Sequence, residues 1–218
     1  MGEQQMKKVA LAFLIGCIFT YVVSAYTDGV ETSLAEGVIR LHVLANSDSE
    51  ADQRLKYQVR DRIIAETGLL FEDSDTIQQT RTEICRQLDH IQQIAQDEVY
   101  RAGYDYPVEV EFGDSEFPTK VYGNVTLPAG TYEALKVKIG SAQGQNWWCV
   151  LFPPLCFVDA TTAEMPEKSQ QQLKAGMGES EYELITQTDR LPVEVRFKAY
   201  EIWQEGRMKL RAMFARLD

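Results

Sequence analysis

The sequence predicts an α+β fold, in which an antiparallel or mixed sheet packs against two or three helices behind an N-terminal apolar export or anchor helix. Apolar residues recur at helical spacing between residues 49 and 103, which predicts two successive helices. Between residues 107 and 139 they recur at every second position, which predicts antiparallel strands. An uninterrupted apolar run precedes both regions, at residues 9–26.

The N-terminal run has the composition of an export signal. Lys7 and Lys8 precede it, and it ends in Val23-Ser24-Ala25, a sequence that suits cleavage after Ala25. Its length of about 18 residues is also the lower limit for crossing a bilayer, so an uncleaved anchor remains open. The lysines favour a cytoplasmic N-terminus, which would place the rest of the chain outside the membrane. We therefore expect a signal peptide or anchor at residues 1–26 and a polar spacer at 27–37.

A strand and a helix are expected next. Residues 38–44 (VIRLHVL) are apolar and β-branched, with alternate positions on one face. The polar cluster at residues 46–49 ends this strand, and Ser49 followed by Asp52 suits the capped start of a helix. That helix is predicted to end near Gly68, and its apolar stripe consists of Ala51, Leu55, Val59 and Ile63.

A second, longer helix is predicted between Asp73-Ser74-Asp75 and Gly103. Cys85 is expected to pack with its apolar side. The apolar stripe consists of Ile77, Ile84, Leu88, Ile91, Ala95 and Val99.

The second half of the chain begins as strands. We predict strands at residues 107–113, 119–126 and 131–139, the last two flanking the turn Leu127–Gly130. Trp147–Phe152 is apolar without alternation, which predicts a strand covered on both faces. Residues 160–190 are polar and are expected to form a surface excursion with one short helix near 179–185. The pattern after residue 193 favours a helix.

Charge restricts the partners of the chain. The protein has 22 basic and 33 acidic residues and a formal net charge of −11. Removal of residues 1–25 takes away Glu3, Lys7 and Lys8, which leaves 20 basic and 32 acidic residues and a net charge of −12. Nucleic acids and anionic lipid headgroups would be repelled by such a domain. Residues 38–218 are long enough to form one domain with a single core, without metal or disulfide support.

No set of residues has the spacing of a known catalytic or metal site, and we expect no cofactor and no enzymatic activity. His42 lies in the first strand and is expected to be hydrogen-bonded and structural, pointing away from Leu41 and Val43. A metal site of His42, Asp48 and Asp52 lacks a supporting motif. An exported hydrolase that uses His42 or Asp48, or a thiol enzyme that uses Cys149 or Cys156, remains the alternative.

The cysteines allow two interpretations. Cys149 and Cys156 would face an oxidising compartment after export, and Pro153-Pro154 between them would supply the bend that a disulfide needs. Two buried free thiols fit the pattern equally well. Their spacing differs from CxxC, so a thiol enzyme has little support.

Three stretches together resemble the stage II sporulation protein R family. They are VIRLHVLANSDSEADQRLKYQVRD (38–61), GTYEALKVKIGSAQGQNWWCVLFPPLCFVD (130–159) and EVRFKAYEIW (194–203). The resemblance implies a protein made in the forespore and exported into the space between forespore and mother cell. It also implies a partner, a membrane-embedded aspartic protease that processes the inactive sigma-E precursor. The chain would then be a signal that activates this protease from its extracytoplasmic side.

Two surfaces are candidates for contact with that partner. The residues are Asn46, Ser47, Asp48, Ser49 and Asp52 in the first loop, and Trp147, Trp148, Phe152, Pro153 and Pro154 in the aromatic–proline stretch. Helix capping and core packing are the respective alternatives. A membrane-tethered structural protein of the spore or its envelope is a third function that the sequence leaves open.

Overall fold

A computed structural model describes residues 11, 13–19, 21, 32–71, 74–156 and 165–186 of the protein. Its strands are β1 (Ile39–Leu44), β2 (Val108–Phe117), β3 (Lys120–Tyr122), β4 (Val125–Leu127), β5 (Gly130–Ile139) and β6 (Asn146–Phe152). Its longer helices are α2 (Glu50–Leu70), α3 (Ile77–Arg101), α4 (Glu167–Met177) and α5 (Glu179–Thr186).

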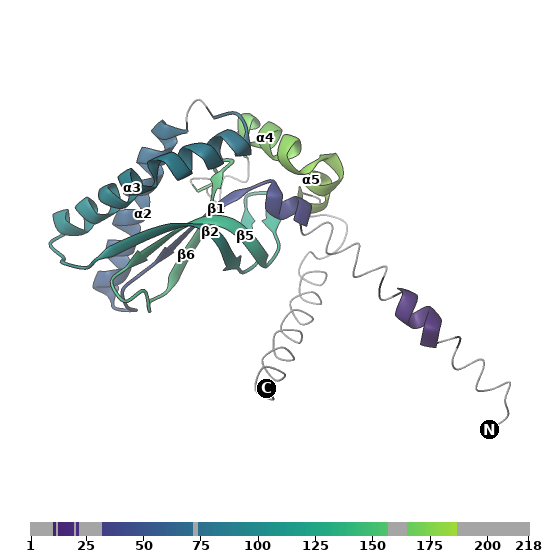
Figure 1. The fold of residues 1–218 in the computed structure, drawn as a ribbon, viewed down its shortest axis with the longest axis horizontal. Helices are drawn as coiled ribbons and strands as arrows, with labels where there is room; N and C mark the ends of the chain where they lie inside the picture. Colours follow the sequence, from purple (N-terminus) through teal and green to yellow (C-terminus); the bar gives the residue numbers. More distant parts are fainter. Residues whose placement is uncertain are drawn as a thin grey trace, which may run out of the picture.

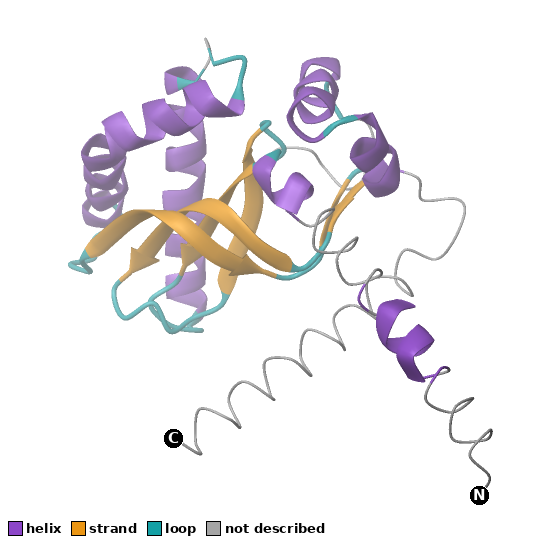
Figure 2. Cartoon of the chain, turned by 45° about the vertical axis from the view of Figure 1, so that its right-hand side comes forward, coloured by secondary structure: helices purple, strands orange, loops and turns teal. Residues whose placement is uncertain are grey.

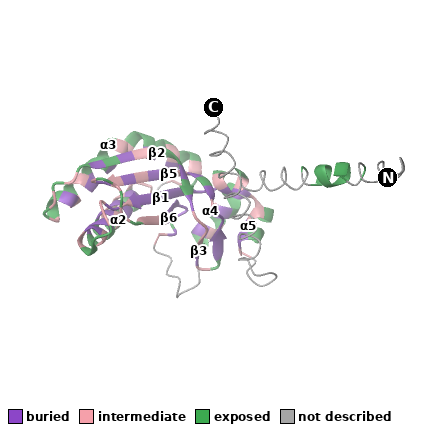
Figure 3. Ribbon diagram, turned by 90° about the horizontal axis from the view of Figure 1, so that it is seen from below, coloured by how far each residue is buried: buried purple, intermediate pink, exposed green. Residues whose placement is uncertain are grey.

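The main sheet has four strands in the order β2-β5-β1-β6. β1 runs parallel to β5, whereas the β1–β6 and β2–β5 pairs are antiparallel, so the predicted α+β fold with a mixed sheet is confirmed. The helices α2 and α3 lie over one face of this sheet (Figure 1). α4 and α5 lie beyond one end of it, near the small sheet of β3 and β4 (Figures 2 and 3).

The core lies between the sheet and the two long helices. Leu41 of β1 lies beside Leu135 of β5, and both side chains are fully buried. The helices contribute the predicted apolar stripes, including Val59 of α2 and Ile91 of α3, to the same cluster. Burial of each such side chain contributes about 1.5–3 kcal/mol, which makes this layer the main source of stability. Cys85, which we expected to be packed, is exposed on α3, so that expectation is wrong.

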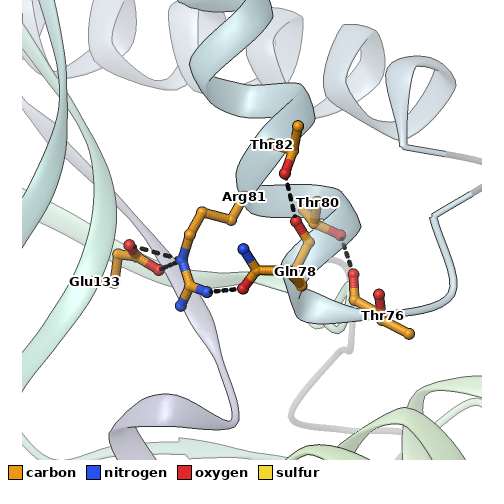
Figure 4. Close-up of polar contacts among 6 residues, drawn as sticks. All are labelled: Thr76, Gln78, Thr80, Arg81, Thr82 and Glu133. Atoms are coloured by element: carbon orange, nitrogen blue, oxygen red, sulfur yellow. Dashed lines mark hydrogen bonds and ion pairs between the residues drawn. The ribbon is translucent and has the colours of Figure 1, made fainter.

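Helix α3 begins slightly later than we predicted from the sequence. Thr76 is the N-cap, and its side chain and that of Gln79 form a reciprocal capping box. One turn later, Arg81 reaches across to Glu133 of β5, with its Nε 2.9 and 2.7 Å from the two carboxylate oxygens (Figure 4). This ion pair ties the helix to the helix-facing side of the sheet.

Residues 119–126 do not form the single strand that we predicted. They contribute to the hairpin of β3 and β4, which is a separate two-stranded sheet. Gly123 has a φ of 57°, a conformation that glycine adopts at low cost, so the chain reverses there. The alternation of apolar residues continues through this turn, which explains why the pattern alone did not show it. β2 in turn extends to Phe117, further than the predicted strand.

The polar region that follows β6 contains more structure than expected. The helix near residues 179–185 is present as α5, but α4 precedes it and was not predicted. Leu173 and Met177 of α4 are buried, so a few apolar residues are sufficient to pack this helix. The glutamine and glycine residues of this segment leave few apolar positions, so the helical spacing of its apolar residues was not evident from the sequence.

Several expectations fall outside the described residues. These are most of the N-terminal run at 9–26, residues 157–164, and the whole segment from 187 to 218, including the predicted C-terminal helix and the third family-like stretch. Residues 13–19 are helical and exposed. Among the described residues there is no helix long and apolar enough to cross a membrane. The export or anchor segment therefore stays a prediction.

Candidate functional site

The loop after β1 is held by its own side chains. Asn46 donates through Nδ2 to Oδ2 of Asp52 at 2.9 Å, and the Ser47 hydroxyl donates to the same oxygen. The Ser49 hydroxyl accepts the amide of Asp52 at 3.2 Å, which is the predicted N-cap of α2. Burial alone would raise the pKa of Asp52, but the hydrogen bonds from Ser47, Asn46 and Ser49 hold it below its ordinary value. The carboxylate therefore organises the loop from inside.

The same loop interlocks with residues 140–145. Oδ1 of Asn46 accepts the amide of Ser141 at 2.9 Å, and Oδ1 of Asp48 accepts the amide of Gln145 at 2.7 Å. A Cβ on Gly144 would lie 2.2 Å from the carbonyl oxygen of Ser47, so only glycine fits there. In this loop, Asp48 and Ser49 are the exposed candidates.

A lysine is buried beneath this loop. Lys56 of α2 is 1% exposed, and its Nζ donates to the carbonyl oxygen of Gln145 at 3.0 Å and to the side chain of Gln53. Desolvation lowers its pKa, and nearby Arg60 lowers it further. Lys56 thus joins α2 to the segment that enters β6, a contact that the helical pattern did not reveal.

The two tryptophans of β6 lie on opposite faces of the sheet, as adjacent strand residues do. Trp147 faces the helices, where it meets Tyr57 edge-on and the guanidinium of Arg60 lies 4.2 Å from a ring centroid. Trp148 faces the other side, stacked with His42 at 5.8 Å, and Nζ of Lys120 lies 5.0 Å from its ring. Both residues are partly exposed, and each has a cation over its ring.

The proline turn closes the end of β6. Phe152 is 4% exposed and Pro153 is also buried, whereas Pro154 is exposed. The Phe152–Pro153 peptide bond is cis. The structure joins Cys149 to Cys156 by a disulfide, with a Cα–Cα distance of 5.1 Å. The accessible part of the aromatic–proline stretch is therefore reduced to the two tryptophans and Pro154.

Among the described strands, β6 pairs only with β1, so it forms one edge of the sheet. Helix α2 covers one face of β6, and Lys120 and His42 cover part of the other. The lack of alternation correctly indicated two contacted faces. It did not indicate whether a second strand lay alongside.

His42 forms a polar chain on the sheet face that points away from α2 and α3. Its Nε2 lies 2.9 Å from Oδ1 of Asn146, and its Nδ1 lies 3.1 Å from the hydroxyl of Ser115. A neutral ring with its proton on Nε2 satisfies both contacts, and burial lowers the pKa of His42, which favours that neutral form. Ser115 and His42 are each 8% exposed, so this serine–histidine pair is closed to a large substrate.

Arg40 is a residue that sequence reasoning missed. It is fully buried on the same face as His42, with its guanidinium carbon 4.0 Å from the centroid of Phe117 and 4.7 Å from that of Tyr132. Its Nη2 donates to the hydroxyl of Tyr122 at 3.0 Å. The signal was a charged arginine two positions before His42 in a strand whose other residues are apolar. The aromatic rings stabilise the cation where a carboxylate would ordinarily do so.

The imagined metal site is not assembled. His42 has its partners in β2 and β6, whereas Asp52 is bonded within the loop and Asp48 to Gln145. Across the part of the chain that the structure describes, histidine, cysteine, aspartate and glutamate form no group of three that could hold a metal ion.

Comparison with known proteins agrees with the motifs that build these loops. The family model described as stage II sporulation protein R matches residues 35–162, more than half of the chain. The stage II sporulation protein R of Bacillus subtilis (strain 168) is 40% identical over 148 residues, which span 68% of this chain and 66% of that protein, just under two thirds of its length. No solved structure matches significantly. The matched residues include the interlocked loops, β1, β6 and both tryptophans, and on this similarity the chain belongs to the stage II sporulation protein R family.

Proposed function

We propose that this protein is an exported sporulation signal that activates a membrane-embedded aspartic protease, which then processes the inactive sigma-E precursor in the mother cell. The observation that carries the proposal is the family match across residues 35–162, which spans β1 through β6. The protease would supply the catalytic carboxylates. The chain would supply a surface whose affinity is higher for the active state of the protease than for the inactive state.

The surface chemistry supports a ligand more than an enzyme. The exposed polar residues of the 46–49 loop are engaged in hydrogen bonds that fix the loop, and the serine–histidine pair is closed. Partly exposed aromatic side chains with cations beside them, as at Trp147 and Trp148, are typical of protein-binding surfaces.

Co-expression of this chain with the protease and its sigma-E precursor in a heterologous host tests the proposal. We expect the precursor to be shortened only when all three are present and the chain is exported. If the precursor is processed equally without the chain, or if the chain has no effect in any dose, the activating role is wrong. Loss of envelope morphology with normal processing would instead favour the structural function.

A further inference from the structure

The two edges of the main sheet differ in how they are protected. At the β2 edge, the amides of Val108 and Val110 donate to the side-chain oxygens of Gln96 and Gln92, at 2.9 and 3.2 Å. Side chains of helix α3 therefore occupy the backbone donors of these two residues, at the N-terminal end of β2. Natural proteins commonly protect edges in such ways, because free strand groups pair with other chains.

Among the described residues, those that protect the β6 edge lie at its C-terminal end. The amide of Leu155 donates to the carbonyl oxygen of Val150 at 3.1 Å, so the proline turn folds back over the outer side of the strand. The disulfide between Cys149 and Cys156 fastens the turn there. The outer side of β6 is thus covered from residue 150 onward.

The outer side of the N-terminal half of β6 is not paired by any described strand. Because N–H and C=O groups of alternate residues point to the same side of a strand, the outward carbonyl of Val150 places those of Trp148 and Asn146 outward as well. Among the described residues, none has a backbone hydrogen bond to these outward groups. Within the described part of the chain, Asn146 and Trp148 consequently present backbone donors and acceptors that no other backbone group bonds.

Side chains on both faces define what would fit this edge. Trp147 and Trp148 flank it from opposite faces, and their buried indole Nε1 atoms find no acceptor among the described residues. Lys120 forms no ion pair with any described residue, and Arg60 pairs with Asp61, whose side chain is 56% exposed. The protein has a net charge of −11, but Lys120 and Arg60 place positive charge beside this edge. The edge would therefore attract a negatively charged group.

We propose that an extended, acidic segment of the partner protein adds to residues 146–148 of β6 as a fifth strand. Adjacent residues of an added strand point to opposite faces, so carboxylates at odd spacing would meet Arg60 on the helix side and Lys120 on the other. A second copy of the chain fits poorly, because it would bring like charges together at the edge. This inference rests on the proposed function, since it assigns the contact surface for that partner.

A matched pair of substitutions isolates the backbone donor. Asn146→Pro and Asn146→Ala both remove the side chain that accepts from His42, but only proline also removes the outward N–H. In the co-expression assay, we expect Asn146→Pro to need about tenfold more protein than Asn146→Ala for half-maximal processing, the effect of one lost intermolecular hydrogen bond. If the two variants reach half-maximal processing at the same amount of protein, the added-strand proposal is wrong, while the activating function stands.

A charge reversal tests the second part of the surface. Lys120→Glu should raise the amount of protein needed for half-maximal processing roughly fivefold, because the attraction to the acidic segment is lost. Lys174→Glu is the control for a charge reversal beside an aromatic ring, because Lys174 lies over Tyr182 at 4.9 Å, but on α4, where it also pairs with Glu179 at 3.3 Å. Equal effects of the two reversals would overturn the assignment of an acidic partner.

Two further outcomes would reassign the edge. A lower unfolding midpoint for Asn146→Pro than for Asn146→Ala would show that the N–H is used within the chain, against the proposal. A dimer in sedimentation that Asn146→Pro dissociates would show a second copy as the occupant, also against it. If the unsubstituted chain never promotes processing, the proposed function fails, and the assigned partner fails with it.

Discussion

His42 lies between Trp148 and Phe117 and is hydrogen-bonded at both ring nitrogens in its neutral form. Burial is the main reason why its pKa lies below the ordinary value, and the positive charges of Lys136 and Arg40 lower it further, against the hydrogen bond to Asn146. The unfolded chain therefore takes up this proton more readily than the folded one.

The free energy of unfolding should accordingly fall as the pH drops from 7.5 to 5.5, through the unfolded pKa of about 6.5. Above that range both states are neutral at His42 and the contribution is constant. His42→Gln has no ionisable ring and should show a flatter profile in the same window, although its stability at pH 7.5 is lower. Urea unfolding at several pH values measures both slopes. Parallel profiles for the two proteins would contradict this account, since the carboxylates with lowered pKa values titrate in both.

The disulfide gives a second prediction at this scale. Titration of the unreduced full-length chain in denaturant should find two reactive thiols, those of Cys17 and Cys85, whereas four would exclude the bridge. Cys85 should also react without denaturant because it is exposed. The double substitution of Cys149 and Cys156 by serine should lower the free energy of unfolding by about 2 kcal/mol, as expected for a short loop.

Single residues were predictable where their role is local. The Ser49 cap follows from residue type and spacing, and it is present. The partners of His42 and Arg40 come from strands more than 70 positions away, so periodicity within β1 showed their face but not their contacts. The sequence could not decide whether Cys149 and Cys156 form a disulfide or remain free thiols, because a separation of seven residues is compatible with either.

At the scale of elements, the interlocked loops explain why two distant motifs belong together. Gly144→Ala would place a Cβ against the backbone of Ser47, which cannot yield as a flexible side chain would. We expect a loss of about 2 kcal/mol or more in the free energy of unfolding, since the two loops must separate. Gly113→Ala is the control, because, apart from its two chain neighbours, no described residue has an atom within 4 Å of the added Cβ. Equal stability of the two variants in urea would show that the loops adapt.

The contact between α3 and β5 is a second test of how the layers are joined. A double-mutant cycle that replaces Arg81 and Glu133 by alanine should give a coupling of about 1 kcal/mol, because both side chains are only about one third or less exposed. The cycle for Arg86 and Glu83, neighbours on α3 with an exposed arginine, should give a smaller coupling. A coupling for Arg81 and Glu133 no larger than that control would mean that packing alone joins the layers.

The elements themselves were predictable to different degrees. Long helices with apolar stripes were placed within a few residues, because their pattern persists over several turns. The hairpin of β3 and β4 was missed, since a single glycine reverses the chain without breaking the alternation. The edge position of β6 was not visible either, because a strand buried by helix and hairpin has the same composition as a central strand.

For the whole molecule, the family is shown, and the proposed contact with another protein rests on that membership. The match to stage II sporulation protein R was accessible from the sequence, because the interlocked loops and β6 form long, specific stretches. The difference between its sheet edges was not, since it depends on which side chains reach the outer backbone groups. Strand order and edge protection are properties of the folded chain alone.

The acidic charge predicts how the domain behaves near membranes. Without residues 1–26, the protein should stay in the supernatant when sedimented with anionic vesicles at low salt, because a net charge near −12 repels them and screening is weak. The full-length chain should pellet with the same vesicles, since the apolar run at 9–26 is long enough to insert. Neutral vesicles are the control, and circular dichroism should confirm that the shortened protein is folded. Sedimentation of the folded, shortened protein with anionic vesicles would contradict the expectation and would reveal a second membrane-binding surface.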